Sequence, residues 1–291
     1  MGTTKSKILI QLDSDLQPSV FDAVVAVDAG ADHLFRHGGV TPANVRDLVY
    51  GALFTRGPTD LHATAIFIGG SNVSAGESIL DTVKKTFFGP FRVSVLFDAN
   101  GANTTAAAAV LAALKGSGGS LEGVSAAVLA ATGPVGHRAA RLLARLGAKV
   151  AVGSRSLDRA KELAEALVQS TGREVTPFAT ADAASLAHSL HGKSVVISAG
   201  AAGVTILPAS AWKTLPDLRV LIDLNAVPPL GIEGVDATDK DAERGTVRAW
   251  GALGVGGTKM KIHKKAIQAL FTANDKVFDA EEVFELGRSL G

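Results

Sequence analysis

Residues 125–146 read SAAVLAATGPVGHRAARLLARL, and this stretch decides the fold. An apolar run of strand length (Ser125–Ala130) leads into a turn with two glycines, and a helix is predicted over Val135–Leu146. The turn matches the G-x-G-x-x-G pattern except that Ala131 holds the first glycine position. A strand, a glycine turn and a helix in this order predict a parallel sheet whose helix N-terminus binds dinucleotide phosphates. A plain tight turn between strand and helix is the alternative interpretation.

The residues of this turn have separate predicted tasks. Gly133 lets the backbone approach a pyrophosphate, and Gly136 lets the helix pack closely on the strand. The helix N-terminus contributes unpaired N–H groups and a partial positive charge. The predicted cofactor contacts of the turn are Thr132, Gly133, Pro134, Val135 and Gly136.

The end of the second strand (Ala148–Gly153) predicts which dinucleotide binds. Roughly 20 residues beyond the glycines, an NAD enzyme carries Asp or Glu for the ribose hydroxyls. This chain has Ser154, Arg155 and Ser156 there, with Arg159 one helical turn further on. A carboxylate would repel a 2′-phosphate, whereas arginine and hydroxyl groups bind it by charge-assisted hydrogen bonds. NADP is therefore predicted over NAD, unless Arg155 is an ordinary solvent-facing arginine.

Two later strands are predicted over Ser194–Ser198 and Val220–Leu224. Small or polar residues follow each of them. Ligands of open α/β sheets bind along the carboxyl ends of the strands. The residues at these two ends are therefore further cofactor candidates: Ala199, Gly200, Asn225 and Ala226.

The rest of the chain also alternates between strands and helices, which predicts an α/β fold with parallel sheets. Strands are predicted over Lys7–Leu12, Ala63–Ile68, Arg92–Phe97 and Ala249–Leu253. Helices are predicted over 18–31, 42–55, 76–87, 104–115, 156–169, 261–271 and 279–290. The glycine-rich segment KGSGGSLEG (115–123) is the predicted domain boundary. We expect an N-terminal α/β domain (1–118), a Rossmann-type domain (119–270) and a C-terminal helix (271–291) that packs back on the first domain.

Composition excludes several classes of function. The 291 residues include no cysteine, which excludes disulfides, Cys-ligated zinc, iron–sulfur clusters and thiol nucleophiles. The net charge of +1 and the lack of a long basic run give no electrostatic case for nucleic acid. No stretch approaches the roughly 20 apolar residues of a membrane span, and the N-terminal apolar run is too short for a signal peptide. We expect a cytoplasmic protein.

Other residue clusters do not predict chemistry. The glycine-rich stretch 69–78 has glutamate where a phosphate loop needs lysine. His33 and His37 lie four residues apart, as metal ligands on a helix would, but no third ligand is evident, and a surface pair is the predicted interpretation. His188, His191 and the acidic stretch Asp236–Asp241 are predicted to be solvated surface. No metal is expected.

Eight motifs follow one another along nearly the whole chain. They are PSVFD (18–22), IGG (68–70), FFGPF (87–91), DANGANTT (98–105), TGPVG (132–136), NAVPPLGI (225–232), GALGVGG (251–257) and VFDAEE (277–282). In this order and at this spacing they resemble one family: the NADP-dependent methylene-tetrahydromethanopterin/methylene-tetrahydrofolate dehydrogenases of methylotrophic bacteria.

The resemblance implies a fold, a reaction and an assembly. Two α/β domains would enclose a cleft, in a homo-oligomer, and the first domain would bind the pterin. The family oxidises the methylene group between N5 and N10 of a tetrahydropterin to the methenyl cation and passes a hydride to NADP. Ala131 and Ser156 depart from the family pattern, the latter where a basic residue can follow the strand-two arginine. Some use of NAD therefore stays open.

The resemblance also implies site residues. The family's catalytic lysine falls on Lys259, with Lys261 as the other assignment. Gly254, in the GALGVGG motif, becomes a cofactor contact. The substrate candidates of the first domain are Phe21, Asp22, Asp98, Asn100 and Thr104, although a threonine that opens a helix is often only its N-cap.

The chemistry agrees with the lack of a recognisable acid–base triad. The hydride leaves a carbon that lies between two nitrogens, whose lone pairs delocalise the positive charge of the product. No strong general base is needed, so the enzyme mainly positions that carbon against the nicotinamide. Lys259 is expected to orient the pterin ring system.

Two other functions stay open. A shikimate-type NADP dehydrogenase shares the two-domain plan and the Asn-Thr pair, but that pair is typically followed by aspartate, and Thr105 follows Asn103-Thr104 here. Its lysine motif is not found in the first domain. The second alternative is a non-catalytic NADP-binding regulator. The preferred carrier, the number of subunits and a cyclohydrolase side activity are not determined by the sequence.

Overall fold

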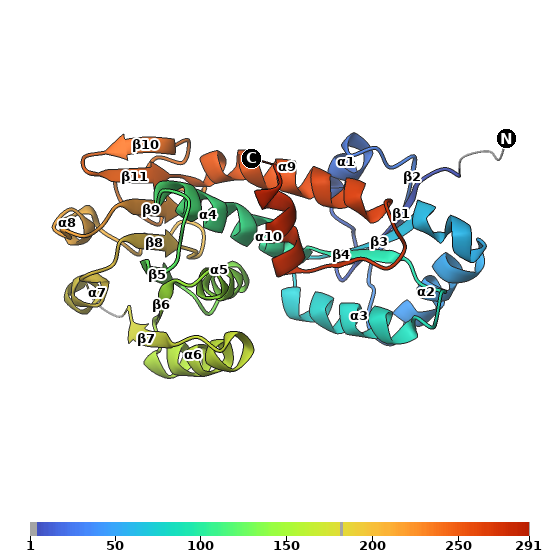
Figure 1. Cartoon of the computed structure of the whole chain (residues 1–291), viewed down its shortest axis with the longest axis horizontal. Helices are drawn as coiled ribbons and strands as arrows, with labels where there is room; N and C mark the ends of the chain where they lie inside the picture. Colours follow the sequence, from blue (N-terminus) through green and yellow to red (C-terminus); the bar gives the residue numbers. More distant parts are fainter. Residues whose placement is uncertain (1–4, 181–182, 291) are drawn as a thin grey trace. The chain divides into compact units, whose positions relative to one another are not determined.

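The computed structural model describes residues 5–180 and 183–290. The chain forms two compact units, one of Met1–Thr104 with Met260–Gly291 and one of Thr105–Lys259. Each unit contains a mainly parallel sheet with helices packed on it (Figure 1). The predicted α/β fold is confirmed. No helix in the described part of the chain is long and apolar enough to cross a membrane.

The first unit contains a five-stranded parallel sheet in the order β12-β4-β3-β1-β2. Its strands are β1 (Ile8–Asp13), β2 (His33–His37), β3 (Thr64–Gly69), β4 (Ser94–Phe97) and β12 (Val277–Phe278). Its helices are α1 (Val20–Asp28), α2 (Val45–Phe54), α3 (Val73–Thr86) and α10 (Ala280–Arg288), with the 3-10 turns η1 (Pro58–Ala63) and η2 (Ala99–Gly101). All residues of β3 and β4 are buried, as expected for inner strands of a parallel sheet.

The second unit contains a seven-stranded sheet in the order β10-β11-β9-β8-β5-β6-β7, parallel except for β10. Its strands are β5 (Ser125–Leu129), β6 (Lys149–Ser154), β7 (Val175–Ala179), β8 (Val195–Ser198), β9 (Val220–Asp223), β10 (Lys240–Arg244) and β11 (Val247–Trp250). Helices α5 (Pro134–Arg145) and α6 (Leu157–Thr171) cover one face; α7 (Ala183–Leu190) and α8 (Ala209–Trp212) cover the other (Figure 1).

Both unit limits fall inside continuous helices, α4 (Ala102–Gly116) and α9 (Ala252–Leu270), and differ from the predicted limits at 118 and 270. The glycine-rich segment belongs to the second unit because it packs there. A Cβ on Gly116 would lie 2.6 Å from Val220 Cγ2, and the Gly123 N–H donates to Gly147 O at 2.9 Å. Residues 271–291 lie in the first unit, where β12 pairs with β4.

The predicted strand Ala249–Leu253 is wrong beyond Trp250, because α9 begins at Ala252. Glycine has a low helix propensity, so the glycine-rich motif 251–257 does not by itself indicate a helix. Tertiary packing explains one of these glycines: a Cβ on Gly254 would lie 1.9 Å from Asp239 O. The helix can therefore start here only with glycine at this position.

Two short edge strands, β2 and β7, had no apolar pattern in the sequence. β2 carries His33 and His37 at its ends, on a strand rather than a helix. Four residues along a strand span about 13 Å, so the two imidazoles cannot bind one metal ion. No group of three metal-ligating side chains occurs within residues 5–180 and 183–290.

The acidic stretch 236–241 is not simply solvated surface, contrary to prediction. Asp239 is buried and accepts a hydrogen bond from Arg244 Nε at 2.9 Å. Asp241 pairs with Lys115 at 3.0 Å and with Arg248. Burial alone would raise the pKa of Asp241, but hydrogen bonds from the two cations outweigh it and lower that pKa. These ion pairs attach β10 to its neighbours.

Candidate active site

The glycine turn lies at the carboxyl end of the central strand β5. Ala130 has a left-handed backbone (φ 52°), and the Gly133 N–H donates to Ala130 O at 3.1 Å. A Cβ on Gly136 would lie 2.8 Å from both Ala130 O and Ala131 Cα, so only glycine lets α5 pack on the turn. A Cβ on Gly133 would have Ala130 O as its nearest neighbour, at 3.4 Å. The protein's own atoms therefore leave space at Gly133, which fits an approaching ligand.

This turn lies at the switch point of the sheet. From β5 the chain continues to β6 and β7 on one side and returns to β8 and β9 on the other. The carboxyl ends of the parallel strands share one edge, which we call the cofactor edge. Open α/β sheets bind ligands at such a point, beside a helix N-terminus. Thr132, Pro134 and Val135 lie in the turn and the first turn of α5.

The end of β6 carries cations and no carboxylate. Arg155 and Arg159 are exposed, and no carboxylate within residues 5–180 and 183–290 pairs with either side chain. Ser156 is the N-cap of α6, where its Oγ accepts from the Arg159 N–H at 3.4 Å. Ser154 is buried, and its Oγ accepts from the Ser156 N–H at 3.4 Å. Cations near a helix N-terminus favour a bound anion. The first turn of α6 also carries an acid, Asp158, which lies 3.9 Å from Lys161.

The loop after β9 is closed by its own side chains. Asn225 donates from Nδ2 to Pro229 O at 3.0 Å and accepts from the Val227 N–H at 2.9 Å. Its amide is thus used within the loop, which leaves the exposed Ala226 as the outward-facing candidate. At the end of β8, the Ala199 N–H donates to Leu129 O at 3.1 Å. A Cβ on Gly200 would lie 2.2 Å from Ile206 Cδ1, so a larger residue here would make the Ile206 side chain move.

Sequence reasoning missed Asp223, the last residue of β9. The side chain is 1% exposed and accepts from the Asn225 N–H at 3.1 Å and the Ile232 N–H at 2.9 Å. Burial raises the pKa of Asp223, while these N–H groups and that of Gly231 lower it, with a net rise. The sequence signal that could have identified it is an aspartate directly after three apolar strand residues.

Helix α9 starts at the cofactor edge, directly after β11, and carries Gly254 and Lys259. Gly254 is buried against the backbone at Asp239, which is a packing role. Lys259 is half-buried and is the last residue of the second unit. Lys261 is exposed. The role of Lys259 and the predicted cleft stay predictions.

The first unit has a switch point of its own, between β1 and β3. Here Asp13 is buried and accepts from the backbone N–H groups of Asp15 (2.9 Å) and Ser19 (3.1 Å). A Cβ on Gly69 would lie 3.3 Å from Asp13 Oδ2 and 3.6 Å from Asp22 Oδ2. Asp22 therefore lies at this edge, beside an aspartate that the sequence prediction did not include.

The other substrate candidates divide into exposed and buried residues. Asn100 is exposed, has a left-handed backbone (φ 54°) and donates its N–H to Gly70 O at 2.7 Å. Phe21 is 52% exposed. Asp98 and Thr104 are buried and hydrogen bonded to each other at 2.6 Å, and Asp98 also accepts from the N–H groups that open α4. Asn100 and Phe21 are thus exposed, and their predicted ligand contacts stay predictions, whereas Asp98 and Thr104 hold the start of α4.

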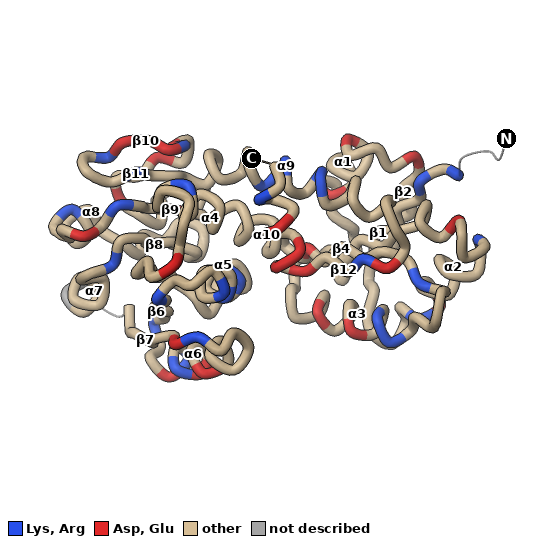
Figure 2. The backbone as a smooth tube through the Cα atoms, viewed as in Figure 1, with Lys and Arg blue, Asp and Glu red and all other residues tan. Residues whose placement is uncertain are grey.

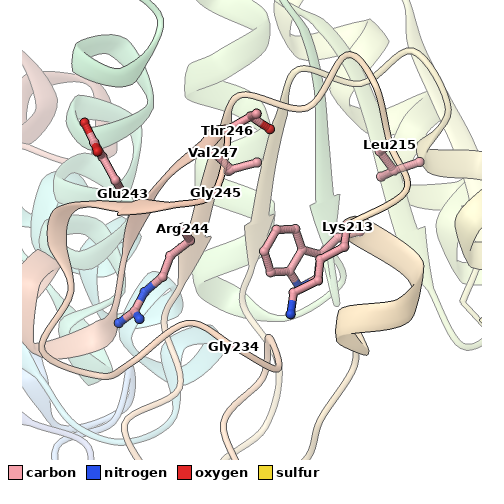
Figure 3. A pocket seen from close by; sticks show the side chains of 9 residues that line it. Lys213, Leu215, Gly234, Glu243, Arg244, Gly245, Thr246 and Val247 are labelled. Atoms are coloured by element: carbon pink, nitrogen blue, oxygen red, sulfur yellow. The ribbon is translucent and has the colours of Figure 1, made fainter.

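A pocket of about 590 Å³ lies elsewhere in the second unit (Figure 3). It is lined by Lys213, Arg244 and Val247 among others, at the amino end of β11 and thus opposite the cofactor edge. Arg244 is paired with Asp236 and Asp239, and these hydrogen bonds raise its pKa. Its charge is therefore already neutralised, and the pocket is separate from the candidate site.

Sequence comparisons place the chain among known proteins. A family model described as "Methylene-tetrahydromethanopterin dehydrogenase, N-terminal" matches residues 20–100. The "Bifunctional protein MdtA" of Methylorubrum extorquens is 49% identical over 98% of this chain and 99% of its own length. The chain belongs to the methylene-tetrahydromethanopterin dehydrogenase family. The predicted family is confirmed.

A second member of the family is more distant. The "NAD(P)-dependent methylenetetrahydromethanopterin dehydrogenase" of Methylorubrum extorquens is 33% identical over 92% of this chain and 93% of its own length. Among solved structures, shikimate 5-dehydrogenase from Listeria monocytogenes has a TM-score of 0.55 at 15% identity, over 98% of this chain and 96% of that one. At that identity the likeness shows a shared fold alone.

Gly136 gives a direct test of the turn in this family member. Gly136→Ala is expected to lower the free energy of unfolding by about 1–3 kcal/mol, because the new Cβ meets backbone atoms that cannot move freely. Urea denaturation measures the change. The matched control is Gly51→Ala, in an exposed position of α2 with nothing within 4 Å of the new Cβ. Equal stability of the two variants would contradict the close packing of α5.

Proposed function

We propose that the protein oxidises methylene-tetrahydromethanopterin, methylene-tetrahydrofolate or both to the methenyl form, with hydride transfer to NADP. The observation that carries the proposal is the 49% identity over nearly the full chain to a curated member of the family. The NAD(P)-dependent relative and the geometry of the cofactor edge support a nicotinamide cofactor. The predicted cytoplasmic location remains part of the proposal.

The residues of the cofactor edge fit a bound dinucleotide. Gly133 leaves space for a pyrophosphate beside the N-terminus of α5. Arg155 and Arg159 stand where a 2′-phosphate would need cations, and no carboxylate within residues 5–180 and 183–290 neutralises them. This supports NADP, and the absence of a ribose-binding acid argues against NAD as the preferred cofactor. When bound, the nicotinamide supplies the hydride acceptor.

The chain itself has little proton chemistry to do. The product cation is stabilised by the two nitrogens beside the reacting carbon, so no side chain has to remove a proton. The residues therefore act by holding the carbon in a productive orientation and by excluding water. In this proposal Lys259 orients the pterin, and Asp22, Asn100 and Phe21 are its contacts from the first unit. Asp98 and Thr104 do not contact the pterin, because their side chains are hydrogen bonded to each other.

An NADPH-formation assay with both methylene carriers tests the reaction. Turnover is expected with NADP and at least one carrier, and none with shikimate. Lys259→Met is expected to lower kcat about a hundredfold, because a misplaced pterin loses its alignment, while the KM for NADP stays within twofold. Lys265→Met, an exposed position on α9, is the matched control.

The assay distinguishes the alternatives. Turnover of shikimate would favour the shikimate-type dehydrogenase, and tight NADP binding without turnover of any substrate would favour a regulator. A Lys259→Met enzyme with normal kcat would remove Lys259 from the site. If Lys261→Met lost activity in its place, the catalytic lysine would be Lys261.

Arg155 determines the cofactor preference in this proposal. Arg155→Ala is expected to lower kcat/KM for NADP roughly tenfold or more, because a charge-assisted hydrogen bond to phosphate is lost, and to leave kcat/KM for NAD within twofold. Steady-state kinetics with each cofactor measure the ratio. Arg173→Ala, an exposed arginine before β7, controls for the loss of a surface charge. An unchanged ratio would mean that Arg155 is a solvated surface residue.

We also propose that the chain forms a homo-oligomer, supported by α1. This helix has apolar residues on two faces: Val25 and Ala26 are buried, while Val20, Val24 and Val27 form a stripe that is 68%, 55% and 61% exposed. Its charged residues are Asp22 and Asp28, and Figure 2 draws the rest of it in tan. Exposed apolar patches on globular proteins often mark protein–protein contacts, and a partner copy would bury each valine for about 1.5–3 kcal/mol.

Val24→Glu is expected to dissociate that oligomer, because it puts a charge in the middle of the apolar face. Sedimentation velocity at micromolar concentration would show a shift toward the 29.7 kDa monomer. Val168→Glu, on the exposed side of α6, is the matched control and should leave the assembly intact. A wild-type protein that sediments as a monomer would contradict the proposal.

A further inference from the structure

The loop that follows β9 is held at both ends by one buried carboxylate. Asp223 Oδ1 accepts from the Asn225 N–H at 3.1 Å, and Oδ2 accepts from the Ile232 N–H at 2.9 Å. The nearby Gly231 N–H also lowers the pKa of this carboxyl group. Residues 226–229 between these anchors are exposed. The loop thus leaves and re-enters the core at a single side chain.

The contact between carboxylate and loop is direct. A Cβ on Gly231 would lie 2.5 Å from Asp223 Oδ1 and 2.9 Å from Ser198 Oγ, so a side chain at 231 would push the loop away. The loop is also tied to the 203–207 segment, where Gly231 O accepts from the N–H groups of Ile206 (2.8 Å) and Leu207 (3.0 Å). Its path is therefore fixed from both sides.

The burial of Asp223 has an energetic cost. The side chain is 1% exposed, and an apolar residue at the end of β9 would avoid the desolvation that raises the pKa of this carboxyl group. Three backbone N–H groups offset part of that cost. A carboxylate at this position fixes the conformation of the loop. It can accept hydrogen bonds from N–H groups at both ends of the loop at once, which an apolar side chain cannot do.

The loop lies at the edge of the sheet where the cofactor is proposed to bind. Asp223 pairs in register with Ser198, the residue before Ala199 and Gly200, so the loop lies beside the end of β8 on the cofactor edge. We infer that Asp223 is a positioning residue for the cofactor: it fixes the loop 225–231 as one wall of the nicotinamide side of the site. The inference rests on the proposed function, because that function provides the nicotinamide.

Asp223→Asn tests the inference, since it keeps the shape and places an N–H donor opposite a backbone N–H. Hydrogen exchange of the peptide 224–232 in the cofactor-free chain is expected to accelerate about tenfold. The Kd for NADPH and the KM for NADP are expected to rise roughly tenfold, while the KM for the methylene carrier stays within twofold. Asp217→Asn, an exposed aspartate before the other end of β9, is the matched control.

Gly231→Ala is the second variant, in case Asp223→Asn does not fold. It keeps the carboxylate but displaces the loop, so the same changes in exchange and NADPH binding are expected. A lower Tm with unchanged exchange in 224–232 and unchanged Kd for NADPH would overturn the inference and leave a purely structural role.

The same experiment separates this inference from the proposed function. If the wild-type chain binds NADPH but oxidises neither methylene carrier, the proposed function fails, and exchange and Kd still decide the role of Asp223. If the wild-type chain does not bind NADPH, both are overturned. If the wild-type chain turns over normally, and Asp223→Asn and Asp217→Asn have the same exchange rate in 224–232 and the same Kd for NADPH, the inference alone fails.

Discussion

Parallel pairing of β5 with both β6 and β8 is the constraint on which the second unit depends. Because β6 and β7 lie on one side of β5 and β8 and β9 lie on the other, the direction of the connections across the sheet reverses at the carboxyl end of β5. The following turn then has to begin a helix within a few residues of the strand end. At that turn the backbone is left-handed at Ala130 and too crowded for a Cβ at Gly136. The space at Gly133 is a consequence of this geometry, and the proposed function puts the pyrophosphate of the cofactor there.

Buried aspartates shape the edges of both sheets. Asp13 ends β1, Asp98 follows β4 and Asp223 ends β9, and each accepts hydrogen bonds from backbone N–H groups of the segment that comes next. A carboxylate at a strand end can satisfy several N–H groups that helix and sheet ladders leave unpaired. These side chains keep loops in place and are hydrogen bonded within the protein, whereas other residues of the same loops are exposed. Asn100 and Arg155 are exposed, whereas Asp98 and Thr104 are buried and bonded to each other.

Local patterns predicted much of this architecture. The inner strands are short apolar runs, the amphipathic helices have a 3.6-residue period, and the glycine turn has a known spacing, so their positions came within a few residues of the structure. The edge strands β2 and β7 were missed because they are mostly exposed or carry a proline, and nothing in their own sequence requires a strand. The start of α9 was missed because one of its glycines, Gly254, packs against Asp239, which lies in a different segment.

The sequence by itself determined the family, the α/β class and the chemical character of the cofactor edge, because each depends on residue types at fixed local spacing. Only the tertiary structure decided which polar residues face outward. Asp98 and Thr104 look like ligand contacts in a motif, yet they are bonded to each other in the interior. Asp223 looks like the end of a strand, yet it holds a loop whose two ends are seven residues apart. A hydrogen bond depends on distance in space, and residues distant in sequence meet only after the strands have paired.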